Sequence, residues 1–170
     1  MATTTRKPTT KVDTRPESKI PENVDLNMLI PVKNGYHGVL SYISPRTREE
    51  FVWDDFGDEQ DMELKELRSA KSTNKAFFEN NYFMFDDGYE WVIDFLGVRK
   101  FYEHAVGMDG FEKIFYSTPA QIKKTISQMS DGQKKSLVYC AKDKIASGEV
   151  DSFKIISALE EALGVALIQK

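Results

Sequence analysis

Cysteine and histidine are scarce in this 170-residue chain, which contains only Cys140, His37 and His104. One thiol cannot form an internal disulfide, so the sequence does not point to an oxidising compartment. A zinc site would need more histidine or cysteine ligands at close spacing. We therefore expect no bound metal, and we interpret Cys140 as a small buried thiol on a helix.

Long apolar runs are missing as well. No stretch approaches the run of about 18 apolar residues that a membrane-spanning helix needs. The segment Met1–Thr10 is polar and lacks the apolar core of a secretory signal. The net charge of −4 argues against the phosphate backbone as the main partner. We expect a soluble protein of the cytoplasm, with no membrane partner and with nucleic acid as a minor alternative at most.

Catalytic motifs are the third absence. The chain has no Gly-x-Ser-x-Gly elbow, no Gly-x-Gly-x-x-Gly loop and no phosphate-binding Gly-Lys-Ser/Thr. The acidic stretch 54–61 lacks the alternating order of a calcium loop. We therefore expect no enzyme, no cofactor and no small-molecule substrate. The residue counts still permit a Cys–His or Ser–His–Asp arrangement, and an unrecognised enzyme would require convergence in space of Asp54, Asp55, Asp58, Glu59 or His37.

What the chain does contain begins with a distinctive N-terminus. Residues 1–25 hold six threonines and three of the six prolines but almost no apolar side chain. Such a segment buries too little surface to offset its ordering entropy, so we predict a flexible arm over 1–25. We expect the arm to become ordered on a neighbouring subunit. Its predicted partner-binding residues are Arg6, Lys7, Lys11 and Arg15.

The rest, 26–170, is predicted to be a single domain, because 41% hydrophobic and 29% charged residues are ordinary for a globular protein. Its strand-rich part, 26–86, shows short apolar or alternating segments over 29–32, 38–43 and 50–53. The turn signals Lys33-Asn34-Gly35 and Ser44–Thr47 separate them, which predicts a three-stranded antiparallel meander. Residues 82–85 are a possible fourth strand. We expect the first hairpin to add to another chain's sheet, with contacts from Ile30, Val32 and Trp53.

Helical periodicity begins after Gly57 and dominates the helical part, 87–170. Asp58 is the predicted cap of a helix that carries Met62, Leu64, Leu67 and Ala70. Further helix starts are predicted at four capping signatures: Asp87–Glu90, Thr118–Gln121, Ser130–Gln133 and Asp151. Strands first and helices afterwards predict the α+β class. The expected architecture is a three- to four-stranded antiparallel meander, then a C-terminal helical bundle, with an extended N-terminal arm.

One segment, 91–105, is similar to a helix-turn-helix. Leu96-Gly97-Val98 provides the turn, and the basic residues Arg99 and Lys100 would begin a second helix. Ile93 argues against it, because a small residue is usual four positions before the turn glycine. A small regulatory adaptor or DNA-binding protein is therefore the alternative function.

The region from Gly38 to Asp87 resembles small structural proteins of large tailed bacteriophages. The resemblance rests on the runs Ser44–Trp53, Phe56–Glu59 and Lys75–Phe83 and has no signature motif. It implies a non-enzymatic virion component or assembly factor near the tail or neck, assembled in the host cytoplasm. No functional residue can be transferred from it. The leading hypothesis is a structural or assembly protein that binds other protein subunits as a homo- or hetero-oligomer.

Overall fold

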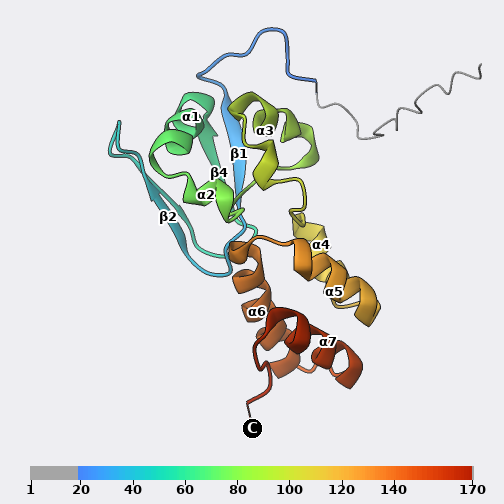
Figure 1. The fold of residues 1–170 in the computed structure, drawn as a ribbon. Coiled ribbons are helices and arrows are strands. Elements are labelled where there is room, and N and C mark those ends of the chain that lie inside the picture. The colour runs from blue at the N-terminus through green and yellow to red at the C-terminus, as the bar shows by residue number, and fades with distance from the viewer. Residues whose placement is uncertain (1–18, 170) are drawn as a thin grey trace, which may run out of the picture.

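A computed structural model of the protein describes residues 19–169 (Figure 1). Strands lie in the N-terminal half and helices dominate the C-terminal half, which confirms the predicted α+β class. The strands are β1 (Leu29–Asn34), β2 (Leu40–Ile43), β3 (Glu50–Trp53), β4 (Glu59–Glu63) and β5 (Phe83–Met84). The helices are α1 (Leu64–Thr73), α2 (Ala76–Glu79), α3 (Glu90–Leu96), α4 (Met108–Ile114), α5 (Pro119–Gln128), α6 (Asp131–Ala146) and α7 (Phe153–Leu163), with 3-10 turns η1 (Asp87–Tyr89) and η2 (Arg99–Phe101).

The strands form two separate antiparallel sheets, in the orders β4-β1-β5 and β2-β3. The predicted pairing of β1 with β2 is therefore wrong, although the hairpin of β2 and β3 is correct. Asn34 explains the error, because it ends β1 as a buried residue and does not form a tight turn. Its side-chain amide donates to the carbonyl oxygens of Gly38 (2.8 Å) and Asp55 (2.9 Å).

Pro31 suggested an edge strand, yet β1 is the central strand of its sheet. The backbone N–H of Asn34 bonds to Asp58 of the β4 side, and that of Gly35 bonds to Tyr82 of the β5 side. Successive residues of a strand alternate in this direction. Pro31 therefore faces the β5 side, where β5 pairs only with Lys33 and Asn34. The absence of a backbone N–H on Pro31 therefore removes no hydrogen bond between strands.

The predicted helix start at Asp58 is also corrected. Residues 59–63 form β4, in which Met62 is opposite Ile30, and α1 begins only at Leu64. The Asp58 carboxylate accepts from the backbone N–H groups of Asp54 (3.0 Å) and Asp55 (2.9 Å). It fixes a loop and does not cap a helix.

Helix caps in the C-terminal half agree better with the predictions. Thr118 and Gln121 form the complete capping box of α5, and Ser130 accepts from Gln133 N–H at the start of α6. Two predicted caps are wrong: α3 begins after η1 with Tyr89 as its N-cap, and Ser152, not Asp151, is the N-cap of α7. Neither makes a side-chain capping bond.

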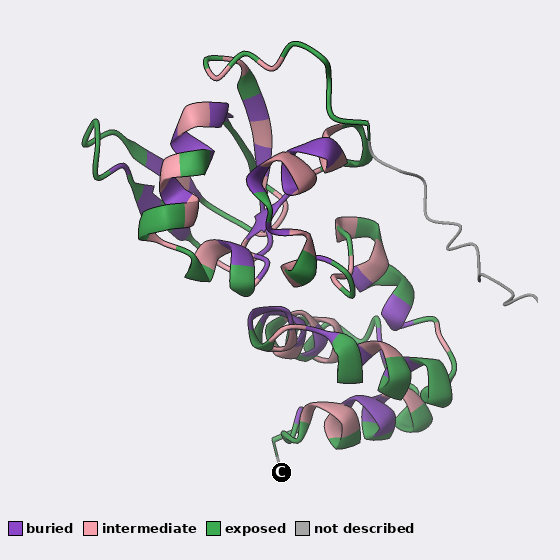
Figure 2. Cartoon of the chain, turned by 45° about the horizontal axis from the view of Figure 1, so that its top comes forward, coloured by how far each residue is buried: buried purple, intermediate pink, exposed green. Residues whose placement is uncertain are grey.

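Buried apolar residues form two cores (Figure 2). The first core includes strand residues and extends to Tyr102, beyond the predicted boundary at residue 87. The second core is built by α4 to α7. Phe56, from the β3–β4 loop, packs on the second core, with its ring centroid 5.1 Å from that of Phe111. Every helix within 19–169 falls short of the length and apolar character that a bilayer crossing requires.

The N-terminal part of α6 sits directly on the first core. A Cβ on Gly132 would collide with the backbone of Asn80, so this approach requires glycine. The Gln133 side chain bonds to both backbone groups of Val106, accepting from N–H at 3.0 Å and donating to C=O at 2.8 Å. Ser136 Oγ lies 3.0 Å from the Gly35 carbonyl oxygen. The contacts of Gly132 with Asn80 and of Ser136 with Gly35 join α6 to the strand-rich half, whereas the Gln133–Val106 bonds lie within the helical half.

Candidate functional site

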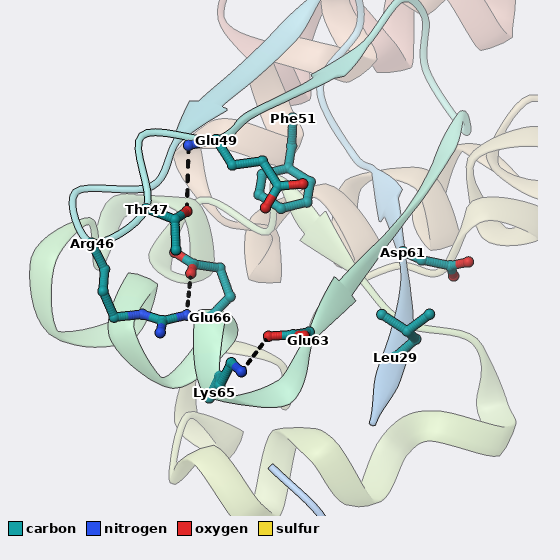
Figure 3. A pocket seen from close by; sticks show the side chains of 9 residues that line it. All are labelled: Leu29, Arg46, Thr47, Glu49, Phe51, Asp61, Glu63, Lys65 and Glu66. Atoms are coloured by element: carbon teal, nitrogen blue, oxygen red, sulfur yellow. Dashed lines mark hydrogen bonds and ion pairs between the residues drawn. The ribbon is translucent and has the colours of Figure 1, made fainter. Parts of the chain in front are cut away.

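A groove of about 320 Å³ lies between the β2–β3 hairpin and the β4–β1 sheet (Figure 3). Glu49 and Phe51 of the hairpin lie on one side, and Asp61 and Leu29 of the sheet lie across the opening (Figure 3). Phe51 is buried, whereas Leu29 is 58% exposed. The other lining residues are Arg46, Thr47, Glu63, Lys65 and Glu66. The groove thus combines two apolar side chains with a charged rim.

The groove exists because two strand edges face each other without pairing. Ser44 N–H bonds to Glu49 C=O, so the backbone groups of Glu50 and Val52 point away from β2. The bond from Asn34 N–H to Asp58 C=O likewise directs the backbone of Asp61 away from β1. These two edges belong to β3 and β4, which pack against each other.

A side chain closes one end of this gap. Gln60 Nε2 donates to the Val52 carbonyl oxygen at 2.8 Å and bridges β4 to β3. Within residues 19–169, the backbone groups of Glu50 and Asp61 have no hydrogen-bond partner. Unpaired N–H and C=O groups on strand edges are the groups that bind an extended peptide.

A buried ionic network supports the hairpin end of the groove. Glu66 is 3% exposed; its carboxylate accepts from Tyr42 Oη at 2.8 Å and from Arg46 Nη2 at 3.0 Å. Burial alone would raise the pKa of Glu66, but hydrogen bonds from Ser44, Tyr42 and Arg46 outweigh it and lower the pKa. Burial and the same carboxylate raise the pKa of Tyr42. Glu66 is therefore an anion that fixes the turn after β2.

The rim of the groove carries an excess of negative charge. Four of its lining residues are acidic and two are basic. Both basic residues have carboxylate partners: Arg46 pairs with Glu66 and Lys65 with Glu63, at 2.8 Å. Glu49 and Asp61 have no ion-pair partner within the described part of the chain, and both are exposed. The groove is thus suited to a basic ligand.

The outer edge of β2 is a second open edge. The hairpin register directs the backbone groups of Val39, Ser41 and Ile43 away from β3. Val39 is 63% exposed and Ile43 is 54% exposed. Fewer charged groups lie on this edge than in the groove. The nearest is Glu50 of β3, whose carboxylate accepts a hydrogen bond from Ser41 Oγ at 3.1 Å.

One cluster has the residue types of a nucleophilic site. Cys140 Sγ lies 3.7 Å from His37 Nδ1, and His37 Nε2 lies 2.8 Å from Asp143 Oδ2. The order thiol–imidazole–carboxylate is that of cysteine nucleophiles activated by a base. Sequence counts alone permitted this arrangement, but only the fold brings His37 of the β1–β2 loop to α6.

The surroundings of this thiol are unlike those of an activated nucleophile. Burial, followed by the charges of Asp143 and Glu112, raises the pKa of Cys140 to about 11. Cys140 lies in the middle of α6, where its backbone N–H is used by the helix and cannot stabilise an oxyanion. The His37 ring also packs beside Tyr139 (5.8 Å between centroids). We interpret the cluster as part of the contact between the two cores.

The predicted partner-binding residues divide into two groups. Ile30, Val32 and Trp53 are 0% exposed, and Trp53 Nε1 donates to the Val32 carbonyl oxygen at 2.9 Å. They belong to the core, so their predicted role in partner contacts is corrected: in this fold they offer a partner no surface. The basic residues Arg6, Lys7, Lys11 and Arg15, with most of the predicted arm 1–25, lie outside the described residues.

The helix-turn-helix prediction for 91–105 is wrong. α3 does end at Gly97, in the left-handed conformation (φ 70°), but only the three-residue 3-10 turn η2 follows. Arg99 does not project outward as a groove-reading side chain would; its guanidinium binds the Asp94 carboxylate twice, at 2.7 Å each. This pair lowers the pKa of Asp94 and raises that of Arg99. A single 3-10 turn cannot place several side chains in a major groove.

The acidic stretch 54–61 does not converge on a cation site. In the described part of the chain, no three His, Cys, Asp or Glu side chains are grouped so that they could hold a metal ion. His37, in the β1–β2 loop, contacts Asp143 of α6 and does not line the groove, whereas Asp61 lies on the groove rim.

Sequence reasoning missed Glu66, Arg46 and Glu49. A signal existed for Glu66: it lies four residues after Met62 and four before Ala70, on the stripe that the apolar residues of the predicted helix occupy. A carboxylate on such a stripe needs buried partners.

No protein-family model matches this chain, and no curated protein or solved structure matches it at a significant level. The resemblance to phage structural proteins therefore stays a prediction.

Proposed function

We propose that this protein is a non-enzymatic structural or assembly protein that binds other protein subunits. The observation that supports it best is the groove between β3 and β4, which has an acidic rim and is lined by Asp61, whose backbone groups point away from β1 and have no hydrogen-bond partner within residues 19–169. An extended segment of another subunit fits these groups, because main-chain bonds supply affinity and the rim supplies selectivity. The bacteriophage virion, near the tail or neck, is the assembly that the resemblance of 44–83 suggests.

The proposal is tested by following the full-length protein in the cells that produce it. Lysate is fractionated by sedimentation, and quantitative mass spectrometry locates the chain. We expect wild-type protein in fractions of much higher mass than its 19.4 kDa monomer. A chain that sediments only as a monomer would contradict the proposal.

Variants connect that result with the groove. Glu49→Lys combined with Asp61→Lys reverses the two rim carboxylates that have no ion-pair partner in the described part of the chain, and it should move the protein to low-mass fractions. Glu103→Lys combined with Asp151→Lys is the matched control: it changes the net charge equally, on exposed residues outside the groove. The control should stay in the high-mass fractions. If both variants behave alike, the groove is not the docking site.

A further inference from the structure

The groove restricts the chemistry of its occupant. The occupant must be extended, since the backbone groups of Asp61, which lines the groove and has no backbone partner within residues 19–169, belong to a strand edge. It must be basic, because Glu49 and Asp61 have no cationic partner within residues 19–169. The part of the occupant that enters the groove must also be short, since the hydrogen bond from Gln60 to Val52 closes one end of the gap between β3 and β4.

One segment of the chain itself meets these requirements. Residues 1–18 carry four basic and two acidic side chains, which gives the segment a charge of +2. The remaining residues, with 19 basic and 25 acidic side chains, carry −6. Opposite charges of this kind steer a segment toward its acceptor and select against other partners.

The backbone preference of that segment is also suitable. Thr3, Thr4 and Thr5 are β-branched and favour an extended strand. Arg6 and Lys7 follow directly, and the first proline comes only at Pro8. In an added strand, Arg6 and Lys7 point to opposite faces, so either can meet a rim carboxylate while the threonines line the edge.

The described start of the chain favours a second copy as the donor. Residues 24–28 are fixed on the first core, where Val24, Leu26 and Met28 pack and Lys65 N–H bonds to Leu26 C=O. The segment before them leads to the α3 side of the molecule, whereas the β2–β3 hairpin lies on the other side (Figures 1 and 2). The described chain and the hairpin that borders the groove therefore begin and lie on opposite sides of the molecule.

We propose that the groove between β3 and β4 binds residues 3–7 of the N-terminal segment of a second copy of this chain. This inference rests on the proposed function, because it names a second copy of the chain as the subunit that binds in the same groove. Each copy offers one segment and one groove, so two copies can exchange segments and close a dimer. If the exchange does not close, the same contact continues from copy to copy and gives a ring or filament.

The test is a charge exchange in the full-length protein, measured by sedimentation velocity over a range of concentrations. Arg6→Glu with Lys7→Glu should weaken self-association about tenfold or more. Glu49→Lys with Asp61→Lys should weaken it similarly. All four substitutions together should restore wild-type association to within about threefold, because the charges are again complementary. The arm substitutions combined with Glu103→Lys and Asp151→Lys should not restore it.

Several outcomes would overturn the inference. Wild-type protein that stays monomeric at all concentrations excludes a second copy as the occupant, whether or not the protein sediments in large assemblies in the cell. If the arm substitutions leave self-association unchanged, the proposed ion pairs between the arm and the groove are excluded. They are also excluded if the variant with all four substitutions does not recover association. Association lost in Ser41→Pro but kept in Ser41→Ala, with the groove variants unaffected, assigns the contact to the outer β2 edge. High-mass sedimentation in the cell keeps the proposed function in each case.

Discussion

Replacement of Glu66 by alanine should destabilise the protein strongly although it removes only a carboxylate. The substitution leaves the hydroxyl of Tyr42, which is 1% exposed, without its acceptor. A buried donor without a partner costs about 1–3 kcal/mol. The turn after β2 should be destabilised as well, because Ser44 hydrogen-bonds to Glu66. The Ser44 hydroxyl also accepts from the backbone N–H groups of Arg46 and Thr47. Arg46 is half exposed and adds little, since water replaces its lost partner.

We expect a total loss of about 3 kcal/mol in the free energy of unfolding, or about 6–12 °C in Tm for a protein of this size. Urea denaturation followed by tryptophan fluorescence measures it, since Trp53 lies in the same core. Glu63→Ala is the control: Glu63 is half-buried, its one ion-pair partner among residues 19–169 is Lys65, and its replacement should cost less than about 1 kcal/mol. If both variants lose the same free energy, the network around Glu66 does not stabilise the fold as argued.

The same residue gives a dependence on pH. The folded state lowers the pKa of Glu66 from its ordinary value of 4.5, so its stabilisation is complete above that value and is lost as the pH falls through the folded pKa. Glu66→Gln cannot titrate. The difference in unfolding free energy between wild type and this variant should therefore shrink as the pH falls from about 7 to about 3. A difference that stays constant over this range would refute the assignment.

Three further predictions concern the helices and the contact between the cores. Thr118→Ala removes the capping box of α5 and should cost about 1 kcal/mol in urea denaturation, whereas Thr118→Ser should cost little. Gly132→Ala should cost more than about 2 kcal/mol, because its Cβ meets the Asn80 backbone, while Gly88→Ala, with open space around it, should be nearly neutral; equal effects would contradict the close approach. Cys140 is half-buried, not fully buried as predicted, and has a pKa of about 11; it should react with iodoacetamide near neutral pH about a hundredfold more slowly in the folded than in the urea-unfolded protein, and equal rates would refute the raised pKa.

Local signals predicted the helix ends well and strand pairing poorly. The capping box of Thr118 and Gln121 involves atoms three residues apart, so the sequence contains the whole interaction. Asn34-Gly35 has an equally clear local preference for a turn. The fold overrides it, because the Asn34 amide is satisfied by Asp55, 21 residues away, which no local pattern reveals.

The acidic residues 59–63 show the same limit. Their composition is typical of a helix start, yet pairing with β1 makes them a strand. The groove was beyond sequence reasoning for a related reason. It is defined by which backbone groups of β3 and β4 stay unpaired, and that follows from the register of two separate sheets. Of its acidic residues only Asp61 belongs to the acidic stretch 54–61 that the sequence shows.

The loop between β3 and β4 serves both halves of the molecule at once. Its Phe56 ring packs against Phe111 of the helical core, while the Asp55 carbonyl oxygen is fixed by Asn34 of the sheet. The same loop joins the two strands that border the groove. We therefore expect a displacement of the helical half to move the loop, and with it β3 and β4, and we expect the proposed bound strand to disturb the contact of Phe56 with α4. Ligand binding in the groove and the position of the C-terminal helices should therefore be coupled through this loop.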